Sequence, residues 1–313
     1  TIFKMNFDIE KINFYIPDKY SSLEELGIIN ADWDIKKIIS KTGVPNIYRS
    51  TDEVLPFIKN AFKKFKFKNV SDIDILIVTT QTSDITLPGI SNQIQSDLKI
   101  KNDVFSFDLG LGCSGFIYSL FVALKLMQGE KTIKRSLLIF CDTYSHYIDK
   151  HDRTMLPLFS DCVSAVLVTN KNNHKILDTD FGSDGSGADH LKIFKNDNNE
   201  KKLFMNGSEV FMFTMSKVPS SVKIILDRNH LDVTDIDYFI FHQASKIVLE
   251  NLIRKIDIPI SKVISSIEKY GNTVSSSIPI VLSENSDKFK KGDKLILCGF
   301  GVGLSWGSIL VEW

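Results

Sequence analysis

Residues 107–116 read Phe-Asp-Leu-Gly-Leu-Gly-Cys-Ser-Gly-Phe, which sets one cysteine, Cys113, between glycines. An apolar run over residues 104–111 leads into this stretch, and apolar residues at helical spacing over residues 116–127 follow it. We therefore predict a strand, a glycine turn and a helix, with Cys113 at the helix N-terminus. Unpaired backbone N–H groups and the helix dipole favour a thiolate there, so the stretch predicts a nucleophilic cysteine with a lowered pKa. A buried structural cysteine is the alternative interpretation.

Two polar turns in the second half of the chain offer partners for this cysteine. Residues 237–241 have the composition of a strand and end at His242, and residues 246–256 then read as an amphipathic helix. Asn272 follows a glycine in a turn before another apolar run. Either residue alone is more often structural. Because Cys113, His242 and Asn272 all stand at the ends of elements, where scaffolds present reactive groups, we predict that they form one site.

An internal repeat connects the two halves of the chain. Residues 71–80 resemble residues 234–243, and residues 136–140 resemble residues 294–298. Both pairs are separated by about 160 residues, far more than the period of a solenoid repeat. The predicted nucleophile and the turn asparagine have nearly the same separation. We therefore expect a duplicated α/β unit in which these two residues occupy equivalent positions about a pseudo-two-fold axis.

The composition limits the classes of protein to which this chain can belong. The chain has 313 residues, of which 43% are hydrophobic, so it has ample material for one large or two fused α/β units. Lys and Arg number 38 and are balanced by 38 Asp and Glu, so no net charge favours nucleic acid or an anionic membrane. No apolar run approaches the length of a membrane span, so we expect no membrane insertion. We see no basic leader before an apolar stretch, and we expect a cytoplasmic protein without a secretory signal.

The four cysteines, Cys113, Cys141, Cys162 and Cys298, form no Cys-x-x-Cys pair and have no metal-ligand spacing. We therefore predict a reduced enzyme without a metal site. Cys141 and Cys298 end strand-like runs, and we interpret both as core residues.

Four motifs, taken together, resemble the β-ketoacyl-acyl-carrier-protein synthase III family of condensing enzymes. They are Cys113-Ser-Gly-Phe, His242-Gln-Ala-Ser, Tyr270-Gly-Asn-Thr and Gly299-Phe-Gly-Val-Gly-Leu-Ser-Trp-Gly307. The resemblance covers nearly the whole chain, in the family's order. It implies a thiolase-like five-layer αβαβα fold made of two halves. Residues 1–172 then form the half that carries the nucleophilic cysteine, and residues 173–313 form the half that carries the histidine and the asparagine.

The order of the histidine and the asparagine distinguishes branches of this superfamily. Thiolases are similar in layout but carry asparagine first and histidine second, with a second catalytic cysteine near the C-terminal glycines. Here His242 precedes Asn272, which resembles the synthase type. Cys298 is one residue out of register with the thiolase cysteine, so we interpret it as a strand residue.

The resemblance implies a two-step reaction without a metal or redox cofactor, in which a coenzyme A thioester is a substrate. Cys113 takes the acyl group from acyl-coenzyme A, and backbone N–H groups near it stabilise the oxyanion. His242 and Asn272 then stabilise the enolate formed when a malonyl thioester on acyl carrier protein loses carbon dioxide. The oxyanion hole and the malonyl pocket are implied at four residues of the last glycine motif: Phe300, Gly301, Val302 and Gly303.

The coenzyme A contacts are implied by further likenesses to the family. Trp33 and Arg153 resemble the pair that holds adenine, although Trp33 lies farther from Gly43 than the family pattern has it. Gly207 and Phe211 resemble residues of the substrate tunnel. Ser245 replaces an asparagine of the housekeeping enzyme near the pantetheine path.

Leu87 resembles the residue that crosses a homodimer and closes the partner's acyl pocket, so the resemblance implies a homodimer. One motif departs from the family, because Phe159-Ser-Asp-Cys-Val-Ser-Ala165 is bulkier at three glycines. Two other hypotheses therefore stay open beside decarboxylating condensation. The chain could be a related acyltransferase that moves the acyl group to an alcohol or amine in a lipid, secondary-metabolite or glycan pathway, or it could be a silent partner subunit. Retention of Cys113, His242 and Asn272 argues against a silent subunit.

Overall fold

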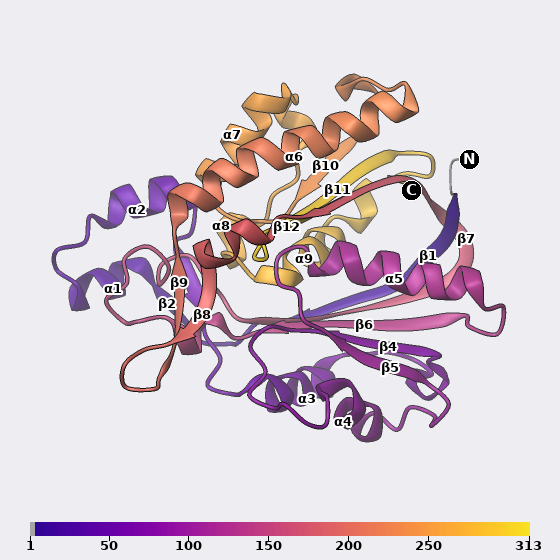
Figure 1. Cartoon of the computed structure of the whole chain (residues 1–313), viewed down its shortest axis with the longest axis horizontal. Coiled ribbons are helices and arrows are strands. Elements are labelled where there is room, and N and C mark those ends of the chain that lie inside the picture. Colours follow the sequence, from indigo (N-terminus) through magenta and orange to yellow (C-terminus); the bar gives the residue numbers. More distant parts are fainter. Residues whose placement is uncertain (1–3) are drawn as a thin grey trace.

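The computed structural model describes residues 4–313 and places eight strands in one sheet path, in the order β10-β11-β12-β7-β6-β4-β5 with β1 beside β7 (Figure 1). These strands are β1 (Met5–Tyr15), β4 (Ile75–Thr79), β5 (Phe105–Leu109), β6 (Arg135–Asp142), β7 (Cys162–Ser183), β10 (Tyr238–Phe241), β11 (Lys294–Gly301) and β12 (Ser305–Glu312). Two small antiparallel pairs accompany them: β2 (Tyr20–Ser22) with β3 (Asn46–Tyr48), and β8 (Leu191–Lys195) with β9 (Lys201–Met205).

Nine α-helices cover or separate the strands in the described part of the chain. They are α1 (Leu23–Ile29), α2 (Ile35–Thr42), α3 (Val54–Lys64), α4 (Ile90–Asp97), α5 (Gly115–Gly129), α6 (Gly207–Asn229), α7 (Lys246–Ile256), α8 (Ile267–Tyr270) and α9 (Ser277–Glu284). In Figure 1, α3 and α4 lie below β4–β6, α5 and α9 lie between the two groups of strands, and α6 and α7 lie above β10–β12. The fold is therefore the five-layer αβαβα arrangement of thiolase-like enzymes, as predicted.

The strand β7 belongs to both groups of strands. Its first residues, 162–169, pair with β6, and residues 175–183 pair with β12. The predicted boundary between the halves, at residue 172, falls inside this strand. The two halves are joined through continuous backbone, and their division at residue 172 stays a prediction.

The internal repeat is confirmed by the pairing of the strands. In the first half, β4 runs parallel to β6, and β6 runs antiparallel to β7. In the second half, β10 runs parallel to β11, and β11 runs antiparallel to β12. Cys113 precedes the middle helix α5, and Asn272 precedes the middle helix α9, so the two residues occupy equivalent positions in the two units.

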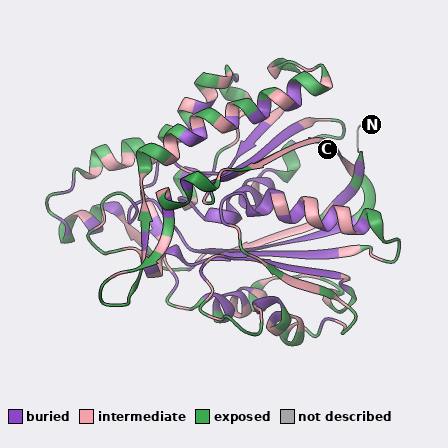
Figure 2. Cartoon of the chain, viewed as in Figure 1, coloured by how far each residue is buried: buried purple, intermediate pink, exposed green. Residues whose placement is uncertain are grey.

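Three inner strands, β4, β6 and β11, are buried along nearly their whole length (Figure 2). In β4, alternate side chains pack on different helices. Ile75 and Ile77 of β4 belong to the core around α5, whereas Leu76 and Val78 pack on α3 and α4. This alternation follows from the two-residue period of a strand, and it explains why β4 is continuously apolar. The predicted helix after Cys113 is α5, and the predicted helix over residues 246–256 is α7, with the same bounds.

Candidate active site

Cys113 lies in the turn between β5 and α5, two residues before the first residue of the helix. Its side chain is 5% exposed. A Cβ atom on Gly301 would come within 3.0 Å of the Cys113 sulfur, and Gly301 has a φ of +155°, in the region that favours glycine. The close approach of the two chain segments therefore requires glycine at position 301.

The predicted lowering of the Cys113 pKa is wrong. Burial, together with a smaller effect of the Asp142 charge, raises the pKa of the thiol to about 12. Backbone N–H groups of Val302 and of Cys113 itself lower the pKa, but they do not outweigh the loss of solvent. The helix N-terminus is present as expected. The sequence did not reveal how completely the fold removes water from the sulfur.

The raised pKa of Cys113 leads us to expect an acylation rate that depends strongly on pH. Because the free enzyme at neutral pH holds a thiol, the thiolate fraction and the initial acylation rate should rise about tenfold per pH unit below the pKa. We expect this slope between pH 8 and pH 9.5, above the pKa of about 7 to which burial raises Asp142. Quenched mixing followed by mass spectrometry of the intact protein measures the rate. A plateau starting below pH 8 would show that the thiol ionises far more easily.

His242 stands at the end of β10 and is almost completely buried. Its Nδ1 atom lies 2.8 Å from the Ser277 hydroxyl oxygen, at the start of α9. The Phe300 ring lies 5.4 Å from the imidazole ring, edge to face. Burial lowers the pKa of His242 to about 3, against a smaller opposing effect of the Val274 backbone. The imidazole is therefore neutral at physiological pH, as the implied mechanism requires.

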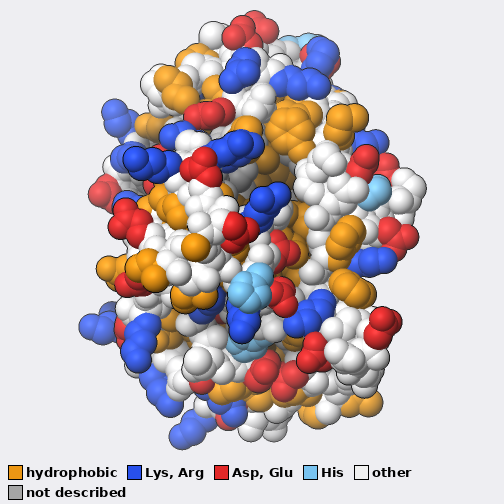
Figure 3. Space-filling view, turned by 90° about the vertical axis from the view of Figure 1, so that its left-hand side faces the viewer, with side chains coloured by type: hydrophobic (Ala, Val, Ile, Leu, Met, Phe, Trp, Pro, Cys, Tyr) orange, Lys and Arg blue, Asp and Glu red, His pale blue; other side chains and the backbone are white. Residues whose placement is uncertain are grey.

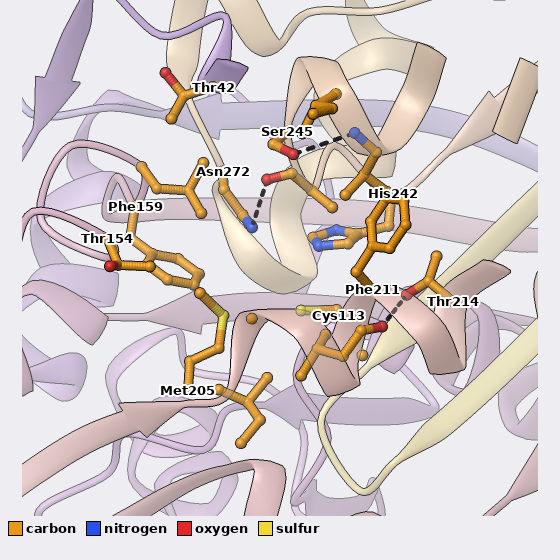
Figure 4. Close-up of a pocket in the computed structure, with 18 of the residues that line it drawn as sticks. Thr42, Cys113, Thr154, Phe159, Met205, Phe211, Thr214, His242, Ser245 and Asn272 are labelled. Atoms are coloured by element: carbon orange, nitrogen blue, oxygen red, sulfur yellow. Dashed lines mark hydrogen bonds between the residues drawn. The ribbon is translucent and has the colours of Figure 1, made fainter. Parts of the chain in front are cut away.

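Asn272 follows Gly271, whose φ is +70°, in the turn after α8. Its amide nitrogen donates to the Ala244 carbonyl at 3.3 Å, and its amide oxygen accepts from the Val274 N–H at 3.0 Å. The amide oxygen of Asn272 thus already accepts a backbone hydrogen bond. One of the two amide hydrogens still has no partner among the described residues and can donate to a substrate. The carboxamide projects beside His242 and opposite Cys113 in Figure 4.

The structure brings these three residues together around one cavity of about 240 Å³ (Figure 4). Most of the predicted site residues also line this cavity: Cys113, Gly207, Phe211, His242, Ser245, Asn272, Phe300 and Gly301. Gly207 begins α6, and Ser245 caps α7 by accepting a hydrogen bond from the Val248 N–H. The wall is predominantly apolar apart from the reactive groups, which is the composition of a small-molecule site.

A second cavity, of about 340 Å³, contains the predicted adenine pair. Trp33 and Arg153 both line it, together with Lys37 and Lys41. Lys41 also lines the catalytic cavity, so the two spaces are neighbours. The structure therefore brings Trp33 and Arg153 together, although the chain between Trp33 and Gly43 is longer than in the family pattern.

The remaining predicted residues do not line the catalytic cavity. Val302 and Gly303 form the turn after β11, and Val302 lines a smaller cavity on the far side of Gly112. Leu87 is 86% exposed and lines neither of the two larger cavities.

Sequence reasoning missed a carboxylate that connects the two halves of the site. Asp142, at the end of β6, accepts hydrogen bonds from the Gln81 N–H at 2.8 Å and from the Ser275 hydroxyl at 2.7 Å. It thereby links the segment that follows Asn272 to Gln81, whose side chain faces Gly112 beside Cys113. Its position after a strand-like run was the only signal in the sequence.

All four cysteines are free and buried, including Cys298 within β11. Among residues 4–313, no group of three or more His, Cys, Asp or Glu side chains is placed to hold a metal ion. No helix of that same region is both long enough and apolar enough to cross a membrane. The cytoplasmic location stays a prediction.

Comparisons with known proteins identify the family that the sequence motifs resemble. Residues 107–185 match the family described as 3-oxoacyl-[acyl-carrier-protein] synthase III, and residues 226–313 match its C-terminal region. The chain is 35% identical to the β-ketoacyl-[acyl-carrier-protein] synthase III of Wolbachia pipientis subsp. Culex pipiens, covering 96% of each chain. It is 32% identical to the Listeria monocytogenes synthase, covering 99% of each chain. The solved Pseudomonas aeruginosa synthase III is similar with a TM-score of 0.87 at 28% identity, covering 98% of each chain.

Proposed function

Since the chain belongs to the β-ketoacyl-[acyl-carrier-protein] synthase III family, we propose that Cys113, His242 and Asn272 perform its acyl-transferring condensation. The observation that carries this assignment is the single cavity that the three side chains share. Cys113 comes from the first half of the chain, and the other two come from the second half. Each residue then has a separate task in one of two half-reactions.

In the first half-reaction, the Cys113 sulfur attacks the carbonyl carbon of acyl-coenzyme A. The developing oxyanion needs hydrogen-bond donors that are already in place, because such donors cost no reorganisation during the reaction. The N–H groups of Cys113 and Val302, which already interact with the sulfur, are the donors we assign to this task. Loss of one such donor typically costs about 2.7 to 4 kcal/mol of transition-state stabilisation.

In the second half-reaction, a malonyl thioester on acyl carrier protein loses carbon dioxide and forms an enolate. We assign the two hydrogen bonds to the enolate oxygen to Nε2 of His242 and to the amide nitrogen of Asn272. Ser277 accepts from the Gln243 N–H at 3.4 Å, so its own hydrogen is available for Nδ1 of His242. We therefore assign the imidazole proton to Nε2. The Phe300 ring beside His242 disfavours a carboxylate there and favours its departure.

We further propose that coenzyme A binds with its adenine between Trp33 and Arg153. Arg side chains stack on aromatic faces and also pair with phosphate. Lys37 and Lys41 line the same cavity with Asp32 and Asp34, so Arg153 leaves it with an excess of one positive charge. Because Lys41 borders both cavities, a ligand seated on Trp33 can extend from there toward Cys113. Figure 3 shows the face that carries α2, where basic and acidic side chains are intermixed around apolar ones.

A homodimer is the predicted assembly, and the edge of the sheet supports it. β5 is the last strand of the sheet path, so one side of its backbone has no neighbouring strand within the described chain. Phe105 on this strand is 53% exposed, and Leu87 is exposed as well. An open, apolar edge strand is a template for pairing with a second copy.

We expect the protein to sediment as a dimer, and Phe105→Lys combined with Leu87→Asp to shift it toward monomer with a large loss of condensing activity. The physical reason is that two charges would be buried at the paired edges. Analytical ultracentrifugation and the condensation assay measure the two effects. Exposed Ile28→Asp is the matched control and should leave the dimer intact. A wild-type monomer with full activity would remove the role of Leu87 in closing a partner's pocket.

The proposed function is tested by reconstituting both half-reactions. Mass spectrometry of the intact protein identifies the acyl donors that load Cys113 from a panel of acyl-coenzyme A thioesters. Addition of malonyl-acyl carrier protein should then yield a β-ketoacyl thioester. Transfer of the acyl group to an alcohol or amine, with no β-ketoacyl product from any malonyl carrier, would contradict the proposal.

A further inference from the structure

A small cavity of about 140 Å³ lies immediately behind the nucleophile turn. Gln81, Tyr144 and Val302 form its inner wall, and Leu191 and Leu203 of the β8–β9 pair contribute to the rest. Lys192 and Ile193 of β8 complete the lining. A cavity of this size suits a short group.

The side chains of the inner wall pack closely against Gly112, the residue before the nucleophile. A Cβ atom on Gly112 would lie 2.5 Å from the Gln81 side-chain oxygen, 3.0 Å from Val302 and 3.1 Å from the Tyr144 hydroxyl. Only glycine leaves room for these groups so close to Cys113. Gly112 thus permits two polar side chains to reach the immediate surroundings of the sulfur.

The two polar side chains are hydrogen-bonded to each other. The buried Tyr144 hydroxyl donates to the Gln81 side-chain oxygen at 3.1 Å, and the Gln81 amide nitrogen donates to the Gly110 carbonyl at 3.3 Å. The Tyr144 ring is held against Phe159, with ring centroids 5.3 Å apart. Burial raises the pKa of Tyr144 well above its ordinary value, so the hydroxyl keeps its proton.

This pair has hydrogen-bonding capacity left for a ligand. The Tyr144 oxygen still has lone pairs to accept with, and the Gln81 amide has a second hydrogen to donate. A ligand hydroxyl can donate to Tyr144 and accept from Gln81 at the same time. A purely aliphatic group can do neither, and it would displace water from both polar atoms without replacing the hydrogen bonds.

We place the acyl chain carried by Cys113 toward this cavity. Its carbonyl oxygen is held by the N–H groups of Cys113 and Val302, and its thiol leaving group departs through the catalytic cavity. The remaining substituent must therefore extend away from His242 and Asn272. Leu191 borders both cavities, and Val302 follows Gly301 directly, so this direction leads past Gly112 to Gln81 and Tyr144.

We propose that Gln81 and Tyr144 determine the acyl specificity, and that they select a short acyl thioester with a hydroxyl on its third carbon over an aliphatic acyl group of the same shape. This inference rests on the proposed function, because it assumes that Cys113 accepts the acyl group. In the loading step, the bond between the acyl carbon and the donor sulfur breaks and the bond to the Cys113 sulfur forms. The proton of Cys113 leaves with the donor thiol, and the substrate hydroxyl is unchanged.

The test compares two donors of matched shape, 3-hydroxybutyryl-coenzyme A in each enantiomer and isovaleryl-coenzyme A, in which a methyl group replaces the hydroxyl. Sites that hydrogen-bond a substrate hydroxyl discriminate strongly against the analogue without it, so we expect wild type to favour one hydroxybutyryl enantiomer by at least about tenfold. The readout is the ratio of initial Cys113 acylation rates, followed by mass spectrometry of the intact protein.

Tyr144→Phe and Gln81→Leu should each bring this ratio close to one. Tyr144→Phe keeps the ring against Phe159, and Gln81→Leu gives an independent result if the first variant does not fold. Tyr147→Phe is the matched control: it removes another buried tyrosine hydroxyl, bonded to the Thr82 carbonyl at 3.2 Å, and it should leave the ratio unchanged.

Equal or faster acylation by isovaleryl-coenzyme A in wild type would overturn the inference, and so would a hydroxybutyryl preference that both variants retain. Acetyl-coenzyme A with wild type separates these outcomes from failure of the proposed function. An acetyl adduct on Cys113 without the hydroxyl preference contradicts only the inference about acyl specificity. No adduct on Cys113 from any of the donors contradicts the proposed function itself.

Discussion

Cys113→Ala is expected to abolish the acyl-enzyme and to lower the condensation rate by roughly 10⁶-fold, the loss typical when a catalytic nucleophile is removed. The reason is that the first half-reaction consists of bond formation at this sulfur. Replacing the thiol group with hydrogen leaves the oxyanion donors in place but provides nothing to carry the acyl group. Incubation with acyl-coenzyme A followed by mass spectrometry of the intact protein measures the adduct.

Cys298→Ala is the matched control for this result. Cys298 is also completely buried, and burial raises its pKa to about 12 as well, but it lies within β11 with Ser308 against its sulfur. It should therefore be inert, and its variant should acylate like wild type. A peptide map that places the acyl adduct on Cys141, Cys162 or Cys298 would contradict the assignment of the nucleophile.

Alanine at either His242 or Asn272 should uncouple the two half-reactions. We expect malonyl decarboxylation and condensation to fall by about 10² to 10⁴-fold, the usual range for a lost hydrogen-bond donor or acid–base group. Acylation of Cys113 should persist, because it requires the sulfur and the backbone N–H groups only. Parallel assays of acyl-adduct formation and of labelled carbon dioxide release measure the two steps.

His174→Asn is a suitable control, since His174 is a largely buried histidine that packs against Trp313 and does not line the catalytic cavity. It should leave both half-reactions unaffected. Equal loss of acylation and decarboxylation in His242→Ala and Asn272→Ala would show that these residues serve the thiol instead. Full activity of Asn272→Ala with loss in His242→Ala alone would favour transfer to an alcohol or amine with histidine as the general base.

The sequence predicted the local elements of the site well. The glycine-flanked cysteine between an apolar run and a helical pattern marked β5, the turn and α5 correctly, and the bounds of α7 were correct to the residue. These features depend on neighbouring residues, and so a local pattern can report them. The repeat also carried long-range information, because two similar units must place Cys113 and Asn272 alike.

Features that arise from packing between distant segments were not visible in the sequence. The pKa of Cys113 is set by burial beneath residues of β11 and by Asp142 at the end of β6, and neither is near it in the chain. The Gln81–Tyr144 hydrogen bond was not visible in the sequence either, because the two residues follow different strands. Trp33 and Arg153 meet because of tertiary structure, which spacing along the chain could not show.

The most direct test of the account is a single-turnover measurement on pre-acylated enzyme. Wild-type protein carrying an acyl group on Cys113 is separated from excess donor and mixed with malonyl-acyl carrier protein labelled in its free carboxyl group. If the acyl-cysteine of one half and the His242–Asn272 pair of the other form one site, one labelled carbon dioxide is released for each acyl group lost, with the same rate constant. Loss of the acyl group without carbon dioxide, or carbon dioxide release that leaves the acyl-cysteine in place, would contradict it.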